Sequence, residues 1–202
     1  MLIDNENKNL KVHEWITKYT ENGTLDIVTG YFTVGALAYL AQKTKDNIDA
    51  YKFILGDIVN IDDVKDRALD LMNENISVEA ALKLSTLAKE AVEFLKREKV
   101  EAKTLEPNFC HAKAYLHVAK DDDRLNYFIS GSSNLTEAGV GLKTTNNVEL
   151  NIAETGNNAQ FKELSEWFET LWKKPQAHKN KTLTDEKGKT YTKPFKQYLI
   201  EE

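Results

Sequence analysis

Residues 109–118 read FCHAKAYLHV, and their side chains alternate in type as they do along a β-strand. Small or apolar residues fall on one face of this strand: Cys110, Ala112, Ala114, Leu116 and Val118. Basic and aromatic residues fall on the other: Phe109, His111, Lys113, Tyr115 and His117. We therefore predict that the first face packs in the core, and that the second is a chemical face holding basic nitrogens.

A strand–helix–strand pattern precedes this stretch. The apolar run LDIVTGYF at 25–32 is followed by a helical pattern, ALAYLAQKTK, at 36–45, and then by AYKFILGDI at 50–58. Because two strands joined by a helix lie parallel in one sheet, the order predicts a parallel pair with a right-handed crossover.

The rest of the chain alternates between the two kinds of element. The patterns predict helices over 10–20, 61–97 (interrupted near 73–75) and 161–174, and strands over 100–106, 109–119, 125–131 and 147–155. The acidic run at 121–123 is most simply a hairpin turn, and a metal-binding loop is the weaker alternative because no further ligands follow at loop spacing. The predicted fold class is α/β, with a mixed β-sheet flanked by helices.

The length of 202 residues and the apolar content of 41% suit one domain, which we place at 1–174. Residues 175–202 are predicted to be a Lys-rich tail or linker. From Lys173 onward eight lysines accompany four acidic residues, whereas the remainder has 19 basic and 28 acidic residues, a balance of −9. This tail could meet phosphates, or it could be a solvated, partly disordered extension. Further domains of a longer protein could follow it.

Composition excludes several classes of protein. The sequence has no run of 18 uncharged apolar residues and no signal-peptide core, so we expect a cytoplasmic protein without a membrane contact. The single cysteine, Cys110, excludes an internal disulfide. One Cys and four His at unrelated spacings give no zinc pattern, so no metal or cofactor is expected.

Three separated segments carry polar residues suited to chemistry on a phosphate. They are His111-Ala-Lys113, Gly131-Ser132-Ser133-Asn134 and Asn147-Val-Glu149-Leu-Asn151. A neutral imidazole such as His111 can attack phosphorus, and a carboxylate such as Glu149 can fix the tautomer of that imidazole. Charge that develops on phosphate oxygens can be met by Lys113, Ser132 and Asn134 without a metal ion.

These segments, in this order and in these strand contexts, resemble the phospholipase D superfamily. The runs IVTGYFTVGALAYL at 27–40 and FILGD at 53–57 resemble its nuclease-like domains, which occur alone, in restriction endonucleases, or at the N-termini of helicase-like proteins. The resemblance implies a phospholipase-D-like sandwich and a metal-independent phosphodiesterase. It implies that His111 is the nucleophile, that Lys113, Ser132 and Asn134 bind phosphate, and that Glu149 orients His111.

Two features depart from the family pattern. The first motif usually continues to an aspartate, and that position is Val118 here, which puts a structural hydrogen bond in doubt. Only one His-x-Lys motif is present, whereas each active centre of the family holds two histidines, one to attack and one to protonate the leaving oxygen. The resemblance therefore implies a symmetric homodimer in which His111 lies near its twofold mate.

Other chemically capable residues have simpler interpretations. His117 would lie about 20 Å from His111 along a strand, so it is read as structural or exposed. Tyr115 is read as a packing residue, with a role beside the substrate as the alternative. The remaining histidines are assigned no role, and the three tryptophans are read as core or interface residues.

The leading hypothesis is an endonuclease that cleaves nucleic acid, expected to be DNA, through a phosphohistidine and at a site shared across a homodimer. A restriction or helicase-associated system is its expected setting. The alternatives are a DNA-binding or dimerisation module with an inactive or weak site and, third, a phospholipase. Salt dependence would separate them, because a nucleic-acid binder weakens steeply as salt rises.

Overall fold

A computed structural model describes residues 1–6, 10–44, 47–56, 78–107, 109–143 and 147–201, and all structural statements refer to these residues. The predicted interruption near 73–75 and the first part of the predicted helix at 61–97 lie outside them. The last part of that helix is present as α4, Val78–Lys96.

The centre of the molecule is an eight-stranded mixed sheet with the order β1-β7-β6-β5-β2-β3-β4-β8. In that order the strands are Leu2–Asp4, Leu150–Thr155, Tyr127–Gly131, Ala114–Ala119, Gly23–Thr29, Ile48–Leu55, Val100–Leu105 and Ala177–His178. Strands β2, β3 and β4 run parallel, and every other neighbouring pair is antiparallel. The predicted parallel pair is therefore confirmed as β2 and β3.

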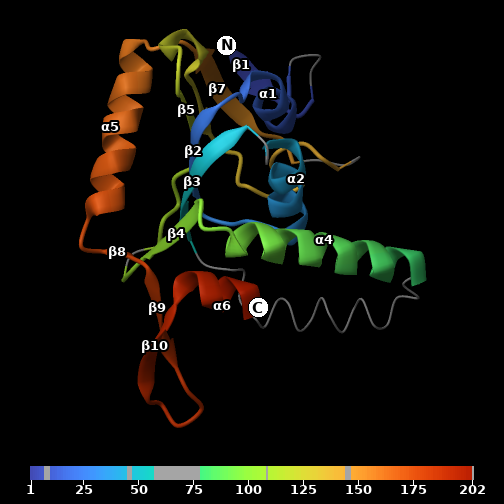
Figure 1. Cartoon of the computed structure of the whole chain (residues 1–202), viewed down its shortest axis with the longest axis vertical. Helices are drawn as coiled ribbons and strands as arrows, with labels where there is room; N and C mark the ends of the chain where they lie inside the picture. The colour runs from blue at the N-terminus through green and yellow to red at the C-terminus, as the bar shows by residue number, and fades with distance from the viewer. Residues whose placement is uncertain (7–9, 45–46, 57–77, 108, 144–146, 202) are drawn as a thin grey trace.

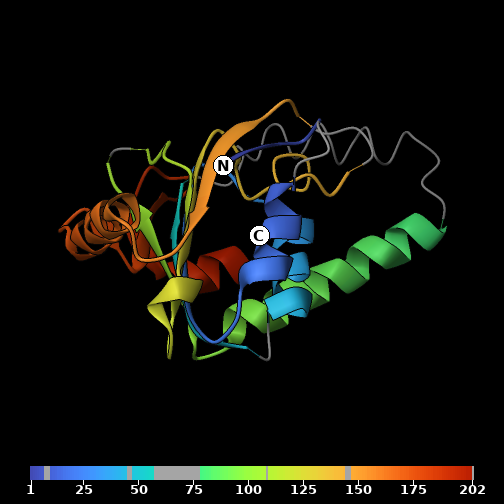
Figure 2. The ribbon, with the colours of Figure 1, turned by 90° about the horizontal axis from the view of Figure 1, so that it is seen from above.

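Helices cover both faces of the sheet (Figure 1). Helix α5, Ala159–Lys173, lies alone on one face, and the view from above shows the others on the opposite face (Figure 2). Those others are α1 (Val12–Tyr19), α2 (Val34–Thr44), α4 and α6 (Phe195–Glu201). The predicted class, an α/β fold with a mixed sheet flanked by helices, is confirmed.

The two helical layers give the protein two apolar clusters. The larger fills the side of α1, α2, α4 and α6 and includes Phe53 and Tyr115. The smaller lies under α5 and includes Leu116 and Phe168. Because helices pack against both faces of the central strands, the side chains on both faces of these strands are buried.

The burial of both sheet faces shows that the prediction of a chemical face over the whole of residues 109–118 was wrong. The strand begins only at Ala114, so His111 and Lys113 precede it rather than lie within it. Beyond that point the second face is core and not a chemical face, because Tyr115 and His117 are buried beneath the helices. Alternation along a strand separates its two faces, but it does not show whether helices cover one face or both.

The C-terminal residues also differ from the prediction of a tail or linker over 175–202. Strand β8 pairs with β4, and β9 (Asn180–Thr184) and β10 (Thr190–Pro194) form a separate hairpin. Helix α6 then buries Phe195, Tyr198 and Leu199 in the larger cluster. These three apolar residues have helical spacing, so they dock the segment although its lysines dominate its composition.

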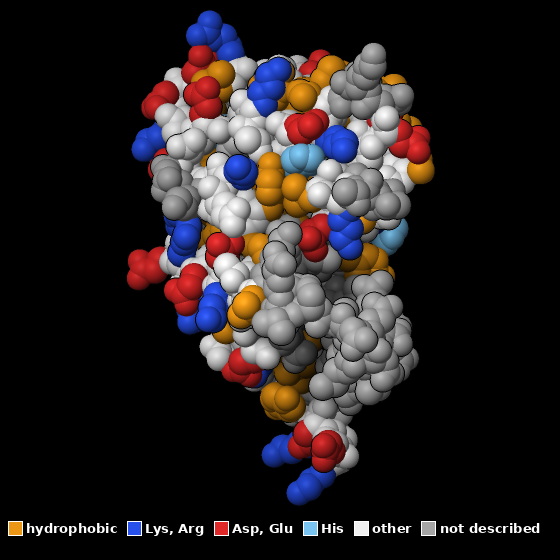
Figure 3. All heavy atoms as spheres, turned by 90° about the vertical axis from the view of Figure 1, so that its right-hand side faces the viewer, with side chains coloured by type: hydrophobic (Ala, Val, Ile, Leu, Met, Phe, Trp, Pro, Cys, Tyr) orange, Lys and Arg blue, Asp and Glu red, His pale blue; other side chains and the backbone are white. Residues whose placement is uncertain are grey.

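Charges of both signs are visible on the described part of the face that carries α1, α2 and α4 (Figure 3). Figure 3 shows Lys and Arg side chains interspersed with Asp and Glu on its coloured part. None of the helices in the described residues combines the length and apolar character needed to cross a membrane.

Candidate active site

The topology brings the three polar segments to one end of the sheet. Strands β5, β6 and β7 are successive antiparallel neighbours, so the start of β5, the end of β6 and the start of β7 lie side by side. The pairing Ala114↔Ser130 and the pairing Gly131↔Asn151 fix this register. Residues separated by up to forty positions in the sequence therefore converge at one edge.

Lys113 and His111 contact each other directly. The Lys113 Nζ lies 3.0 Å from Nε2 of His111 and donates a hydrogen bond to the His111 carbonyl oxygen at 2.7 Å. An ammonium group has no lone pair, so a neutral His111 ring must accept at Nε2 and carry its proton on Nδ1. The imidazole of His111 is exposed, and in this tautomer its Nε2 carries the lone pair of the ring.

Burial lowers the pKa of the Lys113 ammonium group below its ordinary value, and the nearby Glu149 carboxylate opposes this shift. A lysine that is partly removed from water has fewer water molecules to displace when it meets an anion. Lys113 therefore combines a positive charge with the incomplete solvation that favours contact with a phosphate oxygen.

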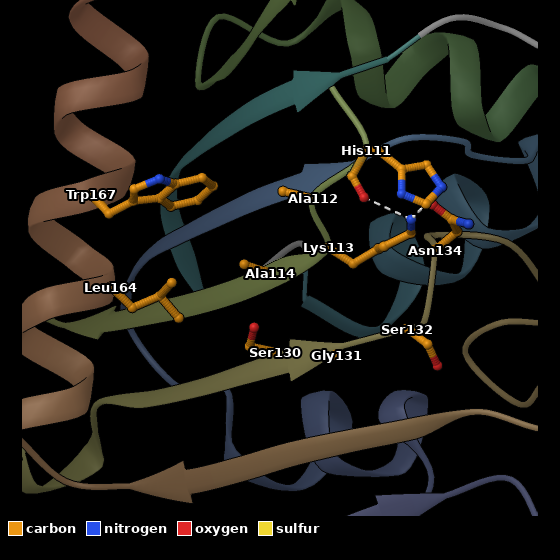
Figure 4. Close-up of a pocket in the computed structure, with 10 residues that line it drawn as sticks. All are labelled: His111, Ala112, Lys113, Ala114, Ser130, Gly131, Ser132, Asn134, Leu164 and Trp167. Atoms are coloured by element: carbon orange, nitrogen blue, oxygen red, sulfur yellow. Dashed lines mark hydrogen bonds between the residues drawn. The ribbon is translucent and has the colours of Figure 1, made fainter. Parts of the chain in front are cut away.

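Asn134 presents an amide donor to the same space. Its Oδ1 accepts a hydrogen bond from the Tyr31 backbone N–H at 3.2 Å and lies 3.2 Å from the Thr29 hydroxyl. These contacts fix the orientation of the amide, which lies beside the His111 ring (Figure 4). Within the described residues Nδ2 has no hydrogen-bond partner, which leaves it available to an anion.

Ser132 and Glu149 bind each other. The Ser132 hydroxyl donates to Oε2 of Glu149, and Oε1 of Glu149 accepts from Asn147 Nδ2 at 3.2 Å. The Ser132 backbone N–H donates to the Leu150 carbonyl at 3.2 Å. Both donors of Ser132 therefore have partners within the chain. The orientation of His111 by Glu149 and the contact of Ser132 with phosphate stay predictions, since the carboxylate meets Ser132 here rather than His111.

Sequence reasoning missed the residues that hold the 131–134 loop. Ser133 is buried; its N–H donates to Oδ1 of Asn151 at 3.2 Å, and Nδ2 of Asn151 donates to its hydroxyl at 2.9 Å. Tyr115 donates from its phenol to the Ser133 carbonyl at 3.0 Å, so its predicted packing role is confirmed. Ser133 is polar and lies in a predicted turn, so the sequence did not indicate that it faces the interior.

Gly131 is required by the close approach of β7 to this loop. A β-carbon at Gly131 would lie 2.7 Å from the Asn151 Cα, closer than real side chains approach a backbone atom. Because glycine has no β-carbon, the loop can lie against β7, where Asn151 can reach Ser133.

Four of the five predicted site residues line one pocket of about 730 Å³ (Figure 4). They are His111, Lys113, Ser132 and Asn134, and its apolar wall is formed by Ala112, Ala114, Leu164 and Trp167. Glu149 lies behind this lining, beside Ser132. Among the described residues, no group of three or more His, Cys, Asp or Glu side chains is arranged to hold a metal ion.

His117 is excluded from this site, as its spacing predicted. It is fully buried, its Nδ1 lies 3.0 Å from the Thr24 carbonyl oxygen, and the Glu21 N–H donates to its Nε2 at 3.4 Å. The structural interpretation of His117 is confirmed. Val118, at the position of the family aspartate, packs against the apolar cluster under α5.

The mixed sheet and its two helical layers form the α/β sandwich that the sequence predicted, with the His-x-Lys segment at one end of the central strands. The chain is similar to "NucT from Helicobacter pylori", with a TM-score of 0.50, 11% identity, and coverage of 88% of this chain and 96% of that one. It also matches a polyphosphate kinase from Porphyromonas gingivalis with a TM-score of 0.47 and 9% identity, over 94% of this chain and 24% of that one. No protein-family model and no curated protein matches the sequence.

Proposed function

We propose that this protein is a metal-independent phosphodiesterase that cleaves nucleic acid through a phosphohistidine at His111. One observation carries the proposal: His111, Lys113, Ser132 and Asn134 line a single pocket at the edge of the sheet. The similarity of the fold to NucT, a nuclease of the phospholipase D superfamily, is consistent with it.

In the first step Nε2 of His111 attacks phosphorus, so that a P–N bond forms and the P–O bond to the leaving oxygen breaks. Before this step the Lys113 ammonium group moves from Nε2 to a phosphate oxygen, which frees the nitrogen lone pair. The charge on the phosphate oxygens is met by Lys113 and by the amide of Asn134. In the second step water attacks phosphorus and gives its proton to the group that protonated the leaving oxygen, the P–N bond breaks, and His111 is regenerated.

The leaving oxygen needs a proton that this pocket does not supply. His111 is the only histidine among the ten residues that line the pocket, and it is the nucleophile. A second imidazole is the natural acid for this step. We therefore include in the proposal a homodimer in which the partner's copy of the same histidine lies across the scissile phosphate.

A binding module with an idle site is the second candidate. Two observations favour it. Val118 stands where the family has an aspartate, and the Glu149 carboxylate accepts a hydrogen bond from Ser132 rather than from His111. Such a protein would bind nucleic acid with a steep salt dependence but would release no product.

Incubation with plasmid DNA and with single-stranded oligonucleotides in EDTA tests the proposal. Cleavage is expected to persist in EDTA and to vanish in His111→Ala. The matched control is His178→Ala, which removes an exposed imidazole on β8 outside the pocket and is expected to cleave normally. Binding without cleavage in the intact protein would favour the idle module, and a requirement for added metal would contradict the mechanism.

A further inference from the structure

Trp167 is the exposed member of the three tryptophans. Trp15 and Trp172 are 3% and 8% exposed, whereas Trp167 is 40% exposed. Four other large apolar side chains of α5 are buried, namely Phe161, Phe168, Leu171 and Trp172, and Leu164 is half-buried. The fold therefore does not need the Trp167 indole for its core, and a large open indole calls for another explanation.

The Trp167 indole forms part of the same pocket as the proposed nucleophile. It reaches from α5 toward Ala112, across the space that His111 and Lys113 border on the other side (Figure 4). The pocket thus has a phosphate-binding end and an aromatic end. Its volume of about 730 Å³ lies within the range of pockets that enclose small organic groups.

A second hollow of about 400 Å³ adjoins this pocket and shares Ser130, Leu164 and Trp167 with it. Its lining adds two apolar side chains, Phe128 and Ile152, and two polar ones, Gln160 and Glu163. The indole therefore stands between two hollows, and hydrogen-bonding groups lie beyond it.

We propose that Trp167 stacks on an unpaired base next to the scissile phosphate, so that the substrate class is single-stranded nucleic acid. The inference rests on the proposed function and adds its substrate class and a specificity-determining residue. Stacking on an indole suits any base, because every base has a π-face. A base in a duplex is already stacked and paired, so it must leave the helix before it can occupy this position.

The polar residues beside Trp167 favour a base over an acyl chain. A base edge can hydrogen-bond to Gln160, Glu163 or Ser130, whereas a hydrocarbon chain would cover these groups without a partner. A phospholipid and a second copy of the chain remain the competing occupants, and the experiment distinguishes them.

Tryptophan fluorescence gives a test that does not depend on catalysis. In a His111→Ala background, a single-stranded 12-mer is expected to quench the emission of the exposed indole, and Trp167→Phe is expected to remove that quenching. Replacing the bases of the 12-mer by abasic residues should abolish the quenching as well. Persistence of the quenching in Trp167→Phe, or equal quenching by an abasic strand, would overturn the inference.

Affinity measured by anisotropy with a labelled 12-mer completes the test. Trp167→Ala is expected to weaken single-strand binding by about 5- to 100-fold, the range found when a stacking aromatic residue is removed. The loss should not add to the loss caused by the abasic strand, because both remove the same contact. Tyr191→Ala, which removes a 47%-exposed aromatic ring on β10, is the matched control and should bind normally.

Three results would overturn the inference. The first is equal affinity of Trp167→Ala and the parent for the 12-mer. The second is quenching by phosphatidylcholine vesicles but not by the 12-mer. The third is loss of self-association in Trp167→Ala while its affinity for the 12-mer stays unchanged. Failure of the proposed function is a separate result: a strand that binds and quenches but is never cleaved by the protein with His111 intact would leave the stacking role standing.

Discussion

Lys113 lies with its Nζ 3.0 Å from Nε2 of His111, so the cation of the site meets the nitrogen that is proposed to attack. This contact occupies the His111 lone pair and keeps the positive charge beside the proposed position of the phosphate. Binding of an anion would draw the ammonium group away and release the nucleophile. The proposed chemistry therefore begins with a movement of one lysine side chain.

Lys113→Met is expected to lower the cleavage rate by a factor of about 100 or more, since it removes a fixed positive charge from the developing phosphate charge. Stability should change little, because the side chain lies at the edge of the sheet and outside both apolar clusters. Single-turnover cleavage and urea unfolding measure the two effects. An unchanged rate would remove Lys113 from the mechanism.

The alkaline limit of activity should also depend on Lys113. Burial lowers the pKa of its ammonium group, so the charge is lost, as pH rises, at a value below that of an ordinary lysine. Lys113→Arg keeps its charge throughout this range, and whatever activity it retains should lack the alkaline decline. A pH–rate profile of both proteins checks this, and identical alkaline limbs would show that another group titrates.

Asn134 and Ser132 should differ in importance although both belong to the same motif. The Asn134 amide is oriented by the Tyr31 N–H and leaves Nδ2 free within the described residues, whereas the Ser132 hydroxyl donates to Glu149. We expect Asn134→Ala to slow cleavage about 100-fold, as loss of a charge-stabilising donor does, and Ser132→Ala to slow it clearly less. Rates measured at saturating substrate decide this, and the reverse order would show that Ser132 turns toward the phosphate.

Asn151 should support the site without touching the substrate. It exchanges two hydrogen bonds with the buried Ser133, so Asn151→Ala leaves buried polar groups without partners. The expected cost is about 1–3 kcal/mol in the free energy of unfolding, together with reduced activity from a displaced 131–134 loop. Urea unfolding measures the first effect, and unchanged stability would contradict the role assigned to this pair.

The candidate site was more predictable from the sequence than the burial around it. His111, Lys113, Ser132 and Asn134 share a pocket because β5 and β6 follow one another in the sequence and pair as antiparallel neighbours, which brings their ends together. The covering of both faces of β5 by helices depends on long-range packing, so the burial of His117 could not be read from alternation. The docking of Phe195 was hidden for a related reason, because the lysines around it dominate the local composition.

Asp26 gives a prediction about stability that lies outside the site. This residue is buried under α5, and burial raises the pKa of its carboxyl group to about 7, against the opposing effect of Lys52 and with a further increase from Glu169. Its Oδ1 has no hydrogen-bond partner among the described residues. Because the folded state holds this proton more tightly than the unfolded state, the stabilisation is complete below the ordinary carboxyl pKa and is lost as pH rises through about 7.

Asp26→Asn removes this titration. Relative to the parent protein, the variant should therefore gain stability between pH 5 and pH 8, on the order of one or a few kcal/mol. Urea unfolding of both proteins at the two pH values isolates the effect, since other titrating groups such as His117 are common to both. A constant difference between parent and variant would show that Asp26 keeps its charge state across this range.

The central claim is that His111 forms a covalent bond to phosphorus. Acid quenching of a single turnover with an end-labelled oligonucleotide in EDTA, followed by a denaturing gel, measures it most directly. The account predicts a covalent protein–oligonucleotide complex that forms and decays within the turnover, maps to His111 and is missing in His111→Ala. Product that accumulates with no such complex at any time in the turnover would contradict the account.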